Sequence, residues 1–151
     1  MGTVVDLKAY WEQVSRFSQY PEDKRADGYA LGLLAEAGEV CGVVDKWLRN
    51  KYDEAEMKRR LVDELGDLMW YFTAWKALEP VNLGMPNNLT CSDISLGVGL
   101  TFRFVNSIRD VMTYGIDWTF LELVLDCCKQ CDTTLQTVLD ANVAKLTERH
   151  G

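Results

Sequence analysis

Two long stretches of the sequence, residues 26–49 and 53–78, carry apolar side chains at the spacing of an amphipathic α-helix. Only the tripeptide NKY separates them, and Asp53 is a residue type that caps the start of a helix. Because a turn this short makes consecutive helices antiparallel neighbours, we expect a helical hairpin at the centre of the fold. No other feature of the sequence constrains the architecture as strongly.

Helical periodicity also dominates the two ends of the chain. It predicts a first helix near residues 5–18, ending before Pro21, and a last helix over DTTLQTVLDANVAKLTERHG with Asp132 as its cap. No stretch alternates between apolar and polar residues with the period of two that marks a strand. We therefore expect an all-α fold in a single domain of 151 residues, a helical bundle built around the hairpin.

The middle of the chain is expected to be a helical insertion that follows a loop. Residues 79–93 contain Pro, Gly and Asn at the density typical of turns. Apolar spacing from Ile94 onwards predicts a fourth helix closed by Gly115, and Asp117 is expected to open a fifth. Residues 94–131 should thus add two helices to the hairpin and the two end helices.

Composition excludes several classes of function. A net charge of −7 argues against a nucleic-acid binder, because such proteins present a basic surface. There is no run of roughly 20 apolar residues that would span a membrane. There is no secretory leader either, so we expect a cytoplasmic protein without a membrane partner. The odd number of cysteines suits a reducing compartment, and we expect them to pack as small apolar residues. They are Cys41, Cys91, Cys127, Cys128 and Cys131.

Two pairs of acidic residues interrupt the apolar stripes of the hairpin. LLAEAGEV, residues 33–40, holds Glu36 and Glu39, and VDELGDLMWYF, residues 62–72, holds Glu64 and Asp67. On a helical wheel each pair falls inside the apolar arc and away from the solvated face. Counted from the turn, Glu39 and Glu64 lie at roughly 15–17 Å and Glu36 and Asp67 at roughly 20–21 Å. The four carboxylates should therefore meet between the two helices.

Such a cluster needs compensation, because ionised carboxylates that lose their hydration repel one another. Lys46 and Arg60 lie near the edges of the two arcs and neutralise part of the charge at most. An all-oxygen set of ligands suits Mg²⁺ or Mn²⁺. A di-iron bundle would need Glu-x-x-His pairs, and the only histidine is His150 at the chain end. The ordinary alternative is a pair of solvated acidic helix faces, which arise easily in a chain with 23 acidic residues.

The two acidic pairs in their context resemble the all-α nucleoside triphosphate pyrophosphohydrolases, the MazG-like family. The matching segments are EAGE at 36–39, ELGD at 64–67 and the closing LDANVAKLTERHG, so the likeness covers about residues 25–78 and 133–150. It implies Mg²⁺-dependent hydrolysis of a nucleoside triphosphate, often a deoxynucleotide, to the monophosphate and pyrophosphate. Glu36, Glu39, Glu64 and Asp67 would be the metal ligands, and Glu39 or Glu36 would also accept the proton of the attacking water.

Further residues are candidates for binding the substrate. The resemblance makes Asn142 a sugar or phosphate contact and Lys145 a triphosphate contact. From the sequence pattern alone, Lys46 is a candidate phosphate contact or a solvated lysine. Tyr71 is a candidate ligand contact or a core tyrosine, and Trp11 in the first helix is a candidate for base stacking or for the core.

The chain also departs from the family pattern, since shorter members pass quickly from the third helix to the last. The insertion leaves substrate and assembly open, although a hairpin of this length favours a homodimer or homotetramer. A dUTPase or dCTPase of narrow specificity remains an alternative within the same fold. A helical interaction or regulatory protein that has lost catalysis is an alternative from another class.

Overall fold

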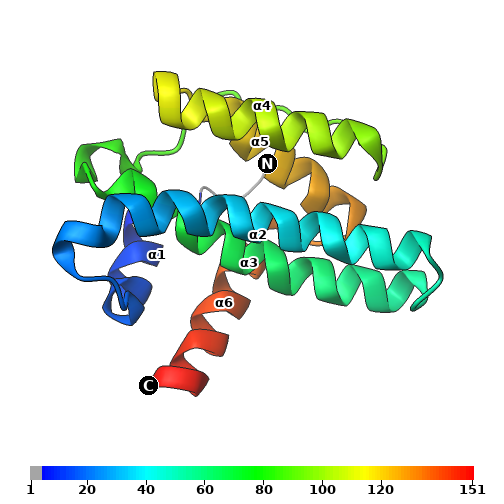
Figure 1. Cartoon of the computed structure of the whole chain (residues 1–151), viewed down its shortest axis with the longest axis horizontal. Helices are drawn as coiled ribbons and strands as arrows, with labels where there is room; N and C mark the ends of the chain where they lie inside the picture. Colours follow the sequence, from blue (N-terminus) through cyan, green and yellow to red (C-terminus); the bar gives the residue numbers. More distant parts are fainter. Residues whose placement is uncertain (1–4) are drawn as a thin grey trace.

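A computed structural model describes residues 5–151, which fold into six α-helices and three short 3₁₀ helices (Figure 1). No strand occurs within this part of the chain, which confirms the predicted all-α class. None of its helices is long and apolar enough to cross a membrane. The α-helices are α1 (Leu7–Val14), α2 (Arg25–Leu48), α3 (Glu54–Ala77), α4 (Val98–Tyr114), α5 (Trp118–Gln130) and α6 (Leu135–His150).

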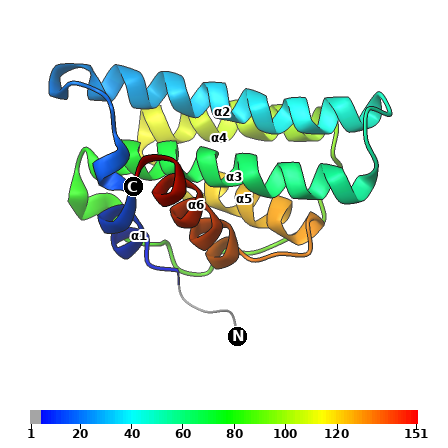
Figure 2. The same cartoon turned by 90° about the horizontal axis from the view of Figure 1, so that it is seen from below.

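The two longest helices, α2 and α3, lie side by side and are joined by a short turn (Figures 1 and 2). Asn50 adopts the left-handed conformation in this turn, with a φ of 61°. The predicted cap is confirmed, since Asp53 accepts a hydrogen bond of 2.8 Å from the backbone N–H of Glu56. Tyr52 donates a hydrogen bond from its hydroxyl to the carbonyl of Val43, which ties the turn back to α2.

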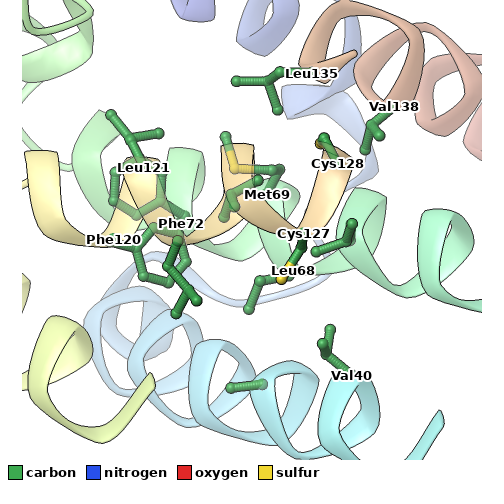
Figure 3. Close-up of a cluster of buried hydrophobic side chains, with 14 of the residues drawn as sticks. Val40, Leu68, Met69, Phe72, Phe120, Leu121, Cys127, Cys128, Leu135 and Val138 are labelled. Atoms are coloured by element: carbon green, nitrogen blue, oxygen red, sulfur yellow. The ribbon is translucent and has the colours of Figure 1, made fainter. Parts of the chain in front are cut away.

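The other helices cover the α2–α3 pair from different sides. Helices α4 and α5 lie along one side of the pair, whereas α1 and α6 lie on another (Figures 1 and 2). Figure 3 shows α5 contributing Phe120, Leu121, Cys127 and Cys128 to the core beside side chains of α2, α3 and α6. The Phe72 and Phe120 rings stack with their centroids 4.5 Å apart. Cys127, Cys128 and Cys131 are buried and free, as predicted for packing residues, whereas the exposed Cys91 does not fit that prediction.

Two helix starts differ from the prediction. Helix α4 begins at Val98 and not near Ile94. Helix α6 begins at Leu135, where Thr134 accepts from the backbone N–H of Thr137. Asp132 lies outside that helix with a φ of 55°, and it pairs with Lys58 at 3.0 Å. The error arose because any Asp, Ser or Thr before an apolar run is a suitable cap, so the sequence did not single one out.

The predicted start of α5 is confirmed, whereas the predicted end of α1 is wrong. Asp117 directly precedes α5 but makes no side-chain cap, because its carboxylate pairs with the buried Lys76 at 2.5 Å. Helix α1 ends at Val14 and continues as a 3₁₀ helix, Ser15–Phe17, so the first helix is shorter than predicted. Within the predicted loop, residues Pro80–Leu83 form another 3₁₀ helix.

Candidate functional site

Three of the predicted carboxylates converge where α2 faces α3. Glu36 comes from α2, and Glu64 and Asp67 come from α3, and all three are partly buried. One oxygen atom from each lies within 4.8 Å of the others. We call these three residues the carboxylate group. Their spacing allows one cation to contact an oxygen from each side chain.

The carboxylate group is electrostatically strained. The Oε2 atom of Glu36 is buried and has no hydrogen-bond partner within residues 5–151. Burial raises the pKa of Glu36 to about 8, and the negative charges of Asp67 and Glu64 add to the effect. Burial and the charge of Asp67 also raise the pKa of Glu64. An unpaired buried carboxylate oxygen destabilises the folded state. A cation or a proton that reaches this site therefore stabilises the protein.

Glu39 does not join the carboxylate group. Its side chain is exposed and lines a hollow on the other side of Glu64. Its charge still contributes to the raised pKa of Glu36. The structure therefore brings three of the four predicted carboxylates together and leaves the fourth beside them.

Helix α6 reaches the carboxylate group through Lys145 and Asn142. The Lys145 ammonium lies 2.7 Å from an oxygen of Asp67 and 3.0 Å from one of Asp63. The buried Asn142 donates to the same Asp67 oxygen at 3.3 Å and accepts a hydrogen bond of 2.6 Å from the hydroxyl of Tyr10. Tyr10 thereby fixes which way the amide of Asn142 points, and the amide in turn orients the carboxylate of Asp67.

An aromatic hollow opens on one side of the carboxylate group. It has a volume of about 490 Å³, and Glu36 and Asp67 form part of its lining. Its walls also include Phe17, Tyr20, Trp70 and Tyr71, with Gln19, Leu146 and His150 beside them. The hydroxyls of Tyr20 and Tyr71 lie 3.0 Å apart, within hydrogen-bond distance. We call this space the first hollow.

Two glycines of α2 allow these tyrosine rings to pack closely against the helix. A Cβ atom on Gly28 would overlap the ring of Tyr20, and one on Gly32 would overlap the ring of Tyr71. The two glycines stand one helical turn apart, so both rings lie directly against the backbone of α2. This close approach sets the position of the Tyr71 ring in the wall of the first hollow.

A second hollow, of about 360 Å³, lies between α2 and α3 towards their connecting turn. Glu39 and Glu64 line its end near the carboxylate group. The rest is lined by cations and acids together with Tyr52, namely Lys46, Arg59, Arg60, Glu56 and Asp63. Lys46, predicted as a phosphate contact, is thus exposed in a different hollow from Tyr71. The two hollows border different members of the carboxylate group, since Glu36 and Asp67 line the first hollow and Glu64 lines the second.

Trp11 lies in an aromatic cluster and lines neither of these hollows. Its ring packs against Trp70 at 5.3 Å and Tyr29 at 6.5 Å between centroids. It borders a separate hollow that contains none of the predicted carboxylates. The structure therefore places Trp11 behind the wall of the first hollow.

The sequence prediction missed the segment that completes the first hollow. Phe17, Gln19 and Tyr20 come from the connection between α1 and α2, where no periodicity points to a site. Gly28 and Gly32 were the available signal, because glycines four residues apart inside a helix mark the close approach of another group. Asp63 was also missed as a partner of Lys145.

No family model, curated protein or solved structure matches this chain. An all-oxygen carboxylate group with an unpartnered buried oxygen fits a hard divalent cation such as Mg²⁺ or Mn²⁺. The adjoining first hollow, with its aromatic walls, fits a planar ring.

Proposed function

We propose that this protein is a metal-dependent nucleoside triphosphate pyrophosphohydrolase of the MazG-like kind. The observation that carries the proposal is the junction of the carboxylate group with the aromatic first hollow at Glu36 and Asp67. A nucleotide presents the same two chemistries, a planar base and a chain of phosphates, within one molecule. The likeness of EAGE and ELGD to the family motif points to the same activity.

The metal-binding part of the proposal assigns Glu36, Glu64 and Asp67 as the ligands of Mg²⁺ or Mn²⁺, with Glu39 joining at the edge. The α2–α3 pair then acts as the hairpin that carries the metal site. When bound, the cation would neutralise phosphate oxygens and lower the pKa of an attacking water. Its charge would also allow a protein of net charge −7 to hold a triphosphate.

The protein's own residues position the reactants. Glu39 or Glu36 accepts the proton of the water that attacks the α-phosphorus, and Asn142 holds the Asp67 carboxylate in place. In the structure, Lys145 pairs with Asp67 and Asp63, and it is the cation on α6 nearest to the phosphates in this proposal. Tyr71 and Tyr20 contact the base in the first hollow. Most of the rate enhancement in such reactions comes from positioning and charge stabilisation.

The experiment that tests this proposal is pyrophosphate release from each common NTP and dNTP, including dUTP, with Mg²⁺ and then with EDTA. We expect release that EDTA abolishes. Glu64→Gln and Glu39→Gln should each lower kcat strongly, whereas Glu12→Gln, an exposed carboxylate on α1, should leave it unchanged. Near-normal turnover in Glu64→Gln would rule out the metal assignment.

The ranking of bases in the same experiment separates a broad enzyme from a dUTPase or dCTPase. A preference of several hundredfold for one base would favour the narrow enzyme. Folded, metal-loaded protein that releases no pyrophosphate from any nucleotide would instead favour a non-catalytic interaction protein.

A further inference from the structure

The two hollows beside the carboxylate group differ in chemistry. The first hollow is aromatic, and no lysine or arginine lines it among the described residues. The second hollow holds three cationic side chains, Lys46, Arg59 and Arg60. A nucleoside triphosphate has a matching asymmetry, with an aromatic base at one end and most of its negative charge at the other.

Four carboxylates and three cations line the second hollow. Glu39 and Glu64 lie beside the carboxylate group, so the rest of the hollow holds the three cations and two acids, Glu56 and Asp63. Glu56 is shared between Arg59 at 3.3 Å and Arg60 at 3.6 Å, so one carboxylate faces two guanidinium groups. Asp63 is already paired with Lys145. Lys46 makes no ion pair within residues 5–151. Positive charge is therefore left over for an anion.

The positions of these cations suit a chain of phosphates that begins at the carboxylate group. Arg60 lies one turn of α3, about 6 Å, from Glu64 towards the connecting turn. Its guanidinium rests over the Tyr52 ring, 4.7 Å from the ring centroid, which holds it at the far end of the hollow. Lys46 lies about 10 Å along α2 from Glu39, and helical side chains lean towards the helix N-terminus, so Lys46 leans back towards the carboxylates.

We propose that the second hollow is the binding site for the pyrophosphate leaving group, held by Lys46 and Arg60. This inference rests on the proposed function and adds the direction in which the substrate binds. The base occupies the first hollow, the α-phosphate lies over the carboxylate group, and the β- and γ-phosphates lie in the second hollow. Guanidinium and ammonium groups bind phosphate oxygens through charge-assisted hydrogen bonds.

Hydrolysis in this arrangement transfers the α-phosphoryl group to water. A water oxygen forms a bond to the α-phosphorus, and the bond between that phosphorus and the bridging oxygen breaks. The electron pair of the broken bond stays on the pyrophosphate, whose negative charge Lys46 and Arg60 face. The water proton passes to the nearby carboxylate, and the products are a nucleoside monophosphate and pyrophosphate.

The test measures binding of the two products separately, by calorimetry in the presence of Mg²⁺. In the Lys46→Ala/Arg60→Ala double variant, we expect the Kd of inorganic pyrophosphate to rise about tenfold or more, the value for losing a charged hydrogen bond. The Kd of the nucleoside monophosphate should stay within about twofold, because its single phosphate lies over the carboxylate group and not in the second hollow. Both side chains are exposed, and a thermal melt checks that the variant folds. Arg109→Ala, an exposed arginine on α4, is the matched control.

The outcomes separate this inference from the proposed function, because turnover is not part of the measurement. Selective loss of pyrophosphate binding supports the inference, even if no nucleotide is hydrolysed. Equal weakening of both products, or no change in either, overturns it. Wild-type protein that binds no pyrophosphate also overturns it, as does loss of pyrophosphate binding in Lys145→Ala with none in the double variant.

Discussion

Glu36 carries a buried carboxylate oxygen without a hydrogen-bond partner in the described part of the chain, beside two further carboxylates. A folded protein retains such a group when something else satisfies it. Lys145 relieves Asp67 and leaves Glu36 unsatisfied. At the residue scale, Glu36 is therefore the side chain with the most to gain from a proton or a metal ion.

This environment predicts a pH-dependent stability. Burial raises the pKa of Glu36 to about 8 in the folded protein, whereas an unfolded chain has a glutamate pKa of about 4.3. The folded state thus binds this proton more tightly, so the contribution of Glu36 to the free energy of unfolding is largest below pH ~4.3 and is lost as the pH rises towards 8. The raised pKa values of Glu64 and Asp67 act in the same direction.

The measurement is the Tm of the protein in EDTA across this pH window. We expect the Tm to fall with rising pH, by about 2–4 °C for each kcal/mol lost. Glu36→Gln should reduce the slope, Glu12→Gln should keep it, and Mg²⁺ should restore the Tm at the upper end. A Tm that does not fall as the pH rises would contradict the assigned environment of Glu36.

Gly32 offers a second prediction at this scale. Alanine in an open helical position stabilises by about 0.5–1 kcal/mol relative to glycine. At Gly32 the added methyl would overlap the Tyr71 ring, so Gly32→Ala should lower the Tm and weaken nucleotide binding. Gly38 lies on the same helix with nothing within 4 Å of its Cβ position, so Gly38→Ala should raise the Tm. Equal Tm changes in the two variants would show that the Tyr71 ring does not pack against the backbone at Gly32.

At the scale of elements, one buried carboxylate connects α4, α5 and the segment between α3 and α4. Asp126 on α5 is 1% exposed and lies 2.6 Å from a guanidinium nitrogen of Arg103 on α4. It also accepts from the backbone N–H of Ser92 at 2.6 Å and from its hydroxyl at 3.1 Å. These bonds lower the pKa of Asp126 against the effect of burial. The part of this segment around Ser92 is thus held by hydrogen bonds to α5.

Removing this carboxylate should cost much of the stability. Asp126→Ala leaves Arg103 and the Ser92 N–H without their partner, and we expect a loss of about 3 kcal/mol in urea unfolding. Asp93→Ala removes an exposed ion pair with Lys129 and serves as the control, with an expected loss below about 1 kcal/mol. Similar losses in both variants would mean that Asp126 does not anchor α4.

At the scale of the whole molecule, the adjacent helices α2 and α4 expose large apolar side chains. Leu31 and Leu34 on α2 are 71% and 59% exposed, and Phe102 and Val105 on α4 are 63% and 58% exposed. Exposed apolar clusters often mark contacts between proteins. The homodimer or homotetramer expected from the sequence remains a prediction, and these side chains are where we expect it to form.

Sedimentation velocity over a range of concentrations tests this expectation. We expect an assembly that Leu34→Glu/Phe102→Glu converts to a monomer, because charges at an apolar contact lose their hydration. Lys8→Glu on α1, an exposed position away from α2 and α4, should leave the assembly intact. Wild-type protein that sediments as a monomer at every concentration would contradict the expectation.

The sequence by itself determined the helices, the pairing of α2 with α3 and the inward direction of Glu36, Glu64 and Asp67. These features depend on local periodicity, on a short turn and on the Asp53 cap, all of which a single sequence contains. The exact helix starts were less determined, because several residues near Thr134 are equally suitable caps.

The tertiary structure decided which residues complete the site. Asn142 reaches Asp67 across 75 positions of sequence, and Tyr20 meets Tyr71 across 51. The packing of α2 against α3 also decided that Glu39 faces the second hollow and not the carboxylate group. The contacts of Asn142 and Tyr20 depend on how α6 and the connection between α1 and α2 pack against α3. The sequence pattern of a helix says which face is buried but not which neighbour covers it.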